Sequence, residues 1–146
     1  MNVQNWIDAL LTIADALKIG EVAAFAKTYD EPFNDSESYP CFVIDSDSIT
    51  DEPQGDSSYP TGPFRRTTEV YILAKCTDNT KTARKTAYQA VDARATLLLN
   101  KLTTNYFKQE LRVLSKSYPK FKIGATDVQA LHLRFSVLMY DEQTSI

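Results

Sequence analysis

The chain has 146 residues, of which 43% are hydrophobic, 11% aromatic and 24% charged. This composition is typical of one soluble globular domain and excludes wholesale disorder, and no apolar run reaches the roughly 20 residues that a membrane-spanning helix needs. The formal net charge of −3 argues against a dedicated nucleic-acid binder, which usually carries a basic domain.

The two parts of the sequence carry opposite charge. Residues 1–63 hold 12 acidic and two basic groups, a balance of −10, whereas residues 64–146 hold 14 basic and seven acidic groups, a balance of +7. Such asymmetry allows one face of a protomer to meet an oppositely charged face of another copy. The alternative, in which the charges intermix over the surface of one folded unit, stays open at this point.

Hydrophobic periodicity predicts two helices. Apolar residues at three- and four-residue steps indicate an amphipathic helix over residues 2–19, which Asn2 or Asn5 can cap and which Gly20 follows. A longer helix is expected over residues 81–103. Its many alanines would let it lie close on a sheet.

Apolar runs and alternation predict five strands. They are expected at residues 21–29, 39–44, 66–76, 112–118 and 128–140. Three strands before the long helix and two after it predict an α+β fold. We expect a mixed or antiparallel sheet of about five strands, with the N-terminal helix and the long helix packed on it.

The stretch from Asp45 to Phe64 shows no periodicity. It contains three prolines, two glycines and five acidic residues, and it separates two predicted strands. Long structureless segments inside a domain are usually functional or disordered. The single domain, residues 1–146, is therefore expected to carry a long protruding loop at about 45–64.

The sequence declares no catalytic chemistry, cofactor site or metal site. The acidic residues between Asp45 and Asp56 depart from an EF-hand loop at three positions. The single histidine, His132, has no metal-ligand spacing or nucleophile motif beside it, and the four glycines form no phosphate-binding loop. Cys41 and Cys76 belong to no short-spaced pair, so free thiols in a reduced, cytosolic protein are expected. We expect the protein not to be an enzyme.

Basic residues gather in the second predicted helix and around residues 116–122. Interleaved aromatic residues make this region compatible with contact to nucleic-acid phosphates. A solvated helix face and a lysine-decorated strand edge explain it equally well. The acidic total favours the second interpretation.

The order of the predicted elements, with three sequence cues, resembles a known family. The cues are the aromatic–proline strand at residues 38–44, the strand at 68–72 that follows a long polar loop, and the alternating strand at 131–137. Over nearly its whole length the chain is similar to the tail terminator proteins (minor tail protein U-like, tail completion) of long-tailed bacteriophages. Residues 104–124 depart from the family pattern.

The resemblance implies a structural virion protein without catalytic residues. Its α+β domain would assemble into a hexameric ring that caps the tail tube protein and presents a surface to a neck or head-completion protein. It would be located in the virion tail after assembly in the host cytoplasm, with DNA only passing through its bore and no membrane contact. The alternatives are a head–tail connector or neck protein and, in a different class, a small cytosolic ligand-binding domain or enzyme with a pocket between sheet and helices.

A closed ring requires two different patches on each protomer. Opposite charge nominates candidate interface residues in the acidic loop and among the basic groups that follow it. These are Asp45, Asp47, Asp51, Glu52, Asp56, Arg65, Arg66, Arg84 and Lys85. Acidic groups of the loop that remain unpaired are expected to line the bore and repel passing DNA.

Overall fold

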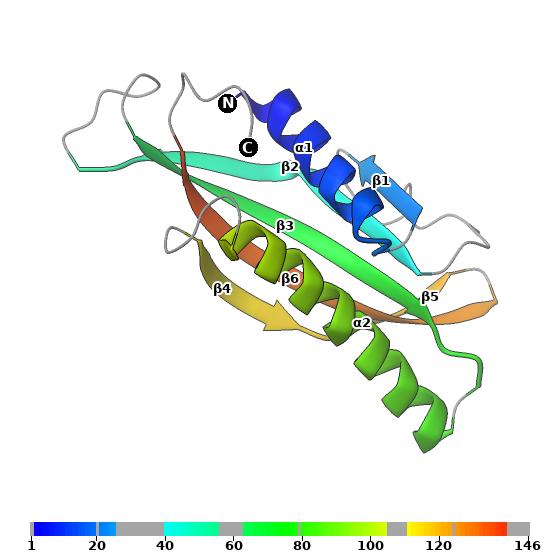
Figure 1. The fold of residues 1–146 in the computed structure, drawn as a ribbon. Helices are drawn as coiled ribbons and strands as arrows, with labels where there is room; N and C mark the ends of the chain where they lie inside the picture. Colours follow the sequence, from blue (N-terminus) through cyan, green and yellow to red (C-terminus); the bar gives the residue numbers. More distant parts are fainter. Residues whose placement is uncertain are drawn as a thin grey trace.

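Two helices lie on one face of a β-sheet in the part of the chain that the structure describes (Figure 1). The structure is a computed structural model and describes residues 2–19, 21–25, 40–55, 63–78, 80–104, 111–123 and 125–139. The elements in chain order are α1 (Val3–Ala16), β1 (Glu21–Phe25), β2 (Cys41–Pro53), β3 (Phe64–Lys75), α2 (Lys81–Leu102), β4 (Arg112–Ser117), β5 (Lys120–Ile123) and β6 (Thr126–Met139).

The described strands form one mixed sheet in the order β1-β2-β3-β6-β4, with β5 also paired to β6. The β1–β2 pair is parallel and every other pair is antiparallel. Both β4 and β5 pair with the same side of β6, and Tyr118 and Pro119 interrupt them. The sheet is therefore five strands wide, which confirms the predicted α+β fold. The short β5 was not predicted.

The first helix begins where the sequence predicts, but it ends at Ala16, three residues before the expected end at residue 19. The Asn2 side chain accepts a hydrogen bond from the Asn5 backbone N–H at 2.8 Å. Beyond Ala16 the chain turns at Lys18, which has a φ of 55°. This left-handed conformation is unfavourable for a residue with a side chain. It directs Ile19 into the core, where that side chain is fully buried.

The second helix packs on β3 and β6 through small and branched apolar residues. Thr80 caps it by accepting a hydrogen bond from the backbone N–H of Ala83 at 3.2 Å. Its buried side is lined by Ala87, Val91, Ala95, Leu98 and Leu102. The alanines let the helix axis approach the sheet closely.

The segment expected as a loop over Asp45–Phe64 is strand over much of its described length. β2 continues to Pro53, and its residues 50–53 pair with residues 64–67 of β3. The register shifts between Asp45 and Thr50, where the Ser48 hydroxyl donates to the Asp45 backbone oxygen at 2.8 Å. Low intrinsic strand propensity is thus overridden by pairing with β3. Residues 56–62 lie outside the described residues. We refer to residues 46–53 of β2 together with 64–68 of β3 as the arm.

Alternation along the strands produces two apolar layers. The larger core lies between the helices and the sheet, and Leu131, Leu133, Phe135 and Val137 contribute fully buried side chains to it from β6. The smaller cluster lies on the opposite sheet face. It consists of Cys41, Val43, Tyr71, Leu73, Val128 and Ala130. Cys41 and Cys76 are both buried as thiols, and no disulfide joins them.

Candidate functional site

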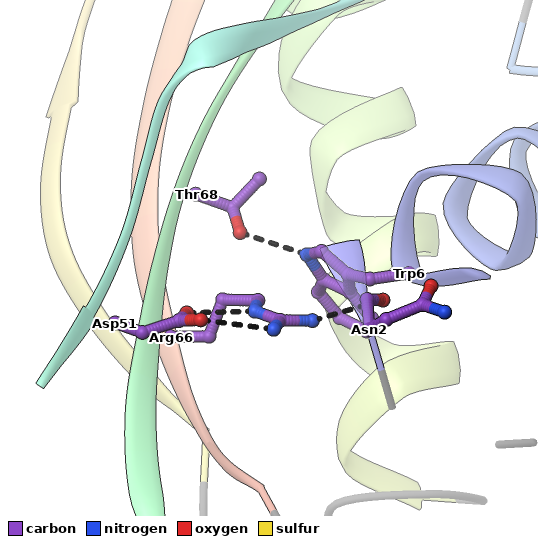
Figure 2. Close-up of polar contacts among 5 residues, drawn as sticks. All are labelled: Asn2, Trp6, Asp51, Arg66 and Thr68. Carbon is purple, nitrogen blue, oxygen red and sulfur yellow. Dashed lines mark hydrogen bonds and ion pairs between the residues drawn. The ribbon is translucent and has the colours of Figure 1, made fainter. Parts of the chain in front are cut away.

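A buried ion pair joins the two strands of the arm to the start of α1 (Figure 2). The Arg66 Nε donates to Asp51 Oδ1 at 2.8 Å, and a terminal guanidinium nitrogen donates to Asp51 Oδ2 at 3.0 Å. The other terminal nitrogen donates to the backbone oxygen of Asn2 at 3.3 Å. Next to it, Trp6 Nε1 donates to the Thr68 hydroxyl oxygen at 2.9 Å. The beginning of the helix is thus fixed to the arm by hydrogen bonds as well as by packing.

Two of the predicted interface residues pair with each other inside the protomer. The Arg66 side chain is 3% exposed and that of Asp51 is 11% exposed, so their charges neutralise one another inside the protomer. The guanidinium carbon of Arg66 also lies 5.3 Å from the centre of the Phe64 ring. Asp51 and Arg66 therefore hold the arm together and present little charge to a partner molecule.

The helix-free face of the sheet carries a row of polar side chains. Asp45, Glu69 and Arg134 are opposite one another on β2, β3 and β6. Burial, and next the Glu69 carboxylate, raise the pKa of Asp45 above its usual value, although backbone N–H groups of the turn oppose the shift. Asp45 Oδ1 is buried and has no hydrogen-bond partner among the described residues. The row is therefore electrostatically strained at Asp45.

His132, on β6, lies beside this row and contacts two side chains of β3. Its Nε2 lies 2.8 Å from Glu69 Oε1, and its ring stacks on Tyr71 with centroids 4.5 Å apart and planes 11° apart. Both contacts are made with side chains of the neighbouring strand β3. His132 thus lies in the strand that the sequence predicts there.

A second polar cluster fixes β4 to α2. The Tyr118 hydroxyl donates to Asp92 Oδ1 at 2.5 Å, and Lys116 Nζ lies 3.1 Å from the same oxygen. Burial acts to raise the pKa of Asp92, but these two contacts together outweigh it and lower that pKa. The contact with Asp92 raises the pKa of both Lys116 and Tyr118. Tyr88 of α2 completes the cluster with an edge-on contact to the Tyr118 ring.

The remaining candidate interface residues lie at two ends of the molecule. Asp47 and Glu52 are exposed on β2, whereas Arg65 is half-buried and donates to the Ser136 hydroxyl at 3.1 Å. Arg84 and Lys85 lie in the first turns of α2, which begins at the end of the sheet farthest from the arm (Figure 1). Within one protomer the structure therefore pairs Asp51 with Arg66 and places Glu52 opposite Arg65 in the register of β2 and β3. It leaves Arg84 and Lys85 apart from the acidic candidates of the arm. Asp56 lies outside the described residues.

Sequence reasoning missed the most exposed strand surface. Every residue of β4 is exposed, and the side chains of Val113 and Leu114 are 47% and 44% exposed. β4 pairs with β6 on one side, and no described strand covers its other side. The run was predicted as a strand, but its place at the sheet edge depends on the pairing of β6 with β3, which local sequence does not encode.

The described part of the chain contains neither a metal-binding cluster nor a membrane-spanning helix. No group of three or more histidine, cysteine, aspartate or glutamate side chains is placed to hold a metal ion there. Among the described helices, none has the length and apolar character needed to cross a membrane.

Comparisons with known proteins leave the family open. No family model and no curated protein matches the sequence. One solved structure, whose name states no function, is 14% identical, with a TM-score of 0.47 over 97% of this chain and 99% of its own. A match of this identity and score establishes neither a family nor an activity for the chain.

Proposed function

We propose that the protein is a tail terminator of a long-tailed bacteriophage. It forms a ring on the end of the tail tube and provides the joint to the neck or head. The observation that carries the proposal is the order of elements along the chain, which resembles that of the tail terminator family. Helix, strand, strand, strand, long helix and final alternating strand are present in that order in the fold.

The shape of the protomer also supports a structural role. Both helices cover one sheet face, and no described helix covers the opposite face or the strand edges, which suits contacts with other molecules (Figure 1). Asp47 and Glu52 give the arm exposed negative charge, and Arg112 gives β4 exposed positive charge. Opposite charges on different patches suit the head-to-tail contacts from which rings are built.

The test is to add the protein to polymerising tail tube protein and to image the products by negative-stain electron microscopy. We expect a ring of about six copies on one tube end and tubes that stop growing. Tubes without added protein are the control. If tube length and tube ends do not change when the protein is present, the terminator proposal is wrong.

A connector or neck protein is the alternative within the same structural class. It would bind the portal or head-completion complex and would leave naked tube ends unchanged. Adding the protein separately to tubes and to tailless heads therefore separates the two roles, because a terminator binds the tube in the absence of heads.

A further inference from the structure

Two strand edges level with the arm have no described partner strand, in addition to the outer edges of β1 and β5. β1 pairs with β2 only as far as Asp45, where Phe25 is its opposite residue. Beyond Asp45, residues 50–53 of β2 pair with β3 alone among the described strands, and residues 46–49 form the irregularity between the two paired stretches. β4 likewise pairs only with β6. Backbone N–H and C=O groups along such edges can accept another strand.

The two edges lie on opposite sides of the sheet at the same level. Thr50 of β2 is opposite Thr67 of β3, Thr67 is opposite Ser136 of β6, and Ser136 is opposite Arg112 of β4. A line across the sheet therefore runs from one uncovered edge to the other. Copies placed side by side along that line bring the β2 edge of one against the β4 edge of the next.

Charge and exposure differ between the edges in a complementary way. The β2 edge carries the exposed carboxylates of Asp47 and Glu52. The β4 edge carries the exposed Arg112, together with two exposed apolar side chains, Val113 and Leu114. Lys120 and Lys122 follow on β5 and extend the positive charge. Two β2 edges repel each other, and so do two β4 edges, whereas a β2 edge attracts a β4 edge.

We infer that β4 of one copy pairs with residues 46–53 of β2 in a second copy, so that the sheet continues from protomer to protomer. The inference rests on the proposed ring and names the surface that closes it. The contact joins two different patches, and repeated contacts of that kind generate rings when the rotation closes. Backbone pairing supplies hydrogen bonds, Val113 and Leu114 supply apolar area, and the charges select the partner edge.

The charges and irregularities of the two edges can also be explained without any second copy of the chain, as protection against association. Charged residues and irregular pairing are features by which edge strands avoid association. Both edges have them, since the register shifts between Asp45 and Thr50 on β2 and between Val113 and Ser115 on β4. If protection is their only role, reversing the charge of both edges together restores nothing.

The first experiment is a charge exchange, read by sedimentation velocity at low salt and at concentrations up to the millimolar range. Arg112→Glu and Glu52→Lys alone are each expected to weaken self-association about two- to tenfold, and the double variant to restore it. Lys81→Glu, an equal charge change at an exposed position of α2 outside the candidate interface set, is the matched control and is expected to have little effect. A wild-type chain that stays monomeric, or a double variant that is not restored, overturns the inference.

The second experiment tests the direction of the contact. Glu52→Cys and Arg112→Cys variants are prepared separately, mixed and oxidised. Disulfide-linked dimers are expected in the mixture and not in either variant alone, because the contact joins unlike edges. Dimers formed by Arg112→Cys alone would show that two β4 edges pair and would overturn the inference.

The two proposals fail in different ways. Tube ends capped by rings that do not cross-link between residues 52 and 112 overturn the strand pairing and leave the terminator role. Cross-linked rings that ignore tube ends overturn the terminator role and leave the strand pairing.

Discussion

At the scale of single residues, the chain combines one satisfied buried charge and one unsatisfied charge on the same strand. Asp51 has both carboxylate oxygens bound by Arg66, whereas Asp45 has a buried oxygen without a partner among the described residues. Burial of a charge is tolerated when it is paired and hydrogen-bonded, and is unfavourable when it is not. Removing each carboxylate should therefore change stability in opposite directions.

Asp51→Ala is expected to lower the free energy of unfolding by about 3 kcal/mol, because it leaves the Arg66 guanidinium buried without its counter-ion. Urea unfolding followed by circular dichroism measures the change. Glu52→Ala, one residue away and exposed, is the control and is expected to stay within about 0.5 kcal/mol of wild type. Equal effects of the two substitutions would contradict a structural role for the ion pair.

Asp45→Asn is expected to raise the free energy of unfolding at pH 7. Burial and the Glu69 carboxylate raise the pKa of Asp45 in the folded state, so the charged form destabilises the fold. As the pH falls through that raised pKa toward the ordinary value of 3.8, wild type becomes protonated and the difference between the proteins disappears. Unfolding curves from pH 7 to pH 3 test this, with Asp47→Asn at an exposed neighbouring site as the control. A difference that persists at pH 3 would show that charge is not its cause.

At the scale of elements, the sequence was most informative where one periodicity ran unbroken. β6 alternates over Leu131–Met139, and α2 repeats its apolar residues at helical steps, so the bounds of both were predicted within two residues. The arm was missed because aspartate, serine and proline in β2 lack strand propensity, and the partner strand supplies the order. The sequence did contain one signal that the arm is ordered. Arg66 is in phase with Phe64, Thr68 and Val70 on the apolar face of β3, so its side chain is expected to be buried.

The candidate site was harder to predict than the fold. Arg66 is a charged residue in phase with a core face, which indicates burial and a nearby counter-ion. The sequence alone does not say which of the five acidic residues between Asp45 and Phe64 supplies that counter-ion. The strand order is equally non-local, since β6 lies between β3 and β4 and leaves β4 at the edge. Residues chosen for charge alone therefore included an internal pair and excluded the exposed Val113 and Leu114.

The contact between α2 and β4 gives a prediction at this scale. Tyr118→Phe removes the hydroxyl that binds Asp92 and is expected to lower the free energy of unfolding by about 1 kcal/mol at pH 7. Since this hydrogen bond helps to lower the pKa of Asp92, its contribution is present above pH 3.8 and is lost as the pH falls through the lowered pKa. Tyr88→Phe, which keeps the ring contact on the same cluster, is the control. A loss that is independent of pH would show that the Asp92 contact is not responsible.

At the scale of the whole molecule, the opposite charges of the two uncovered edges predict a dependence on salt. The screening length falls from about 10 Å at 0.1 M salt to about 3 Å at 1 M, so self-association should weaken as salt is added. Sedimentation velocity over that range measures it. Arg112→Glu should flatten the dependence because it removes an attractive contact. Association that strengthens with salt would indicate an interface held by apolar contacts alone.

The central place of β6 also affects the timing of folding during synthesis. β6 is the last described strand of the chain, yet it joins β3 to both β4 and β5. While a ribosome is still making residues 126–139, β4 and β5 have no described strand to pair with, and the apolar face of α2 lacks the part of the sheet that β6 supplies. Contacts between residues distant in sequence form slowly. The nascent chain therefore completes the described sheet only after β6 has emerged, and until then the apolar surfaces that β6 covers are exposed to chaperones.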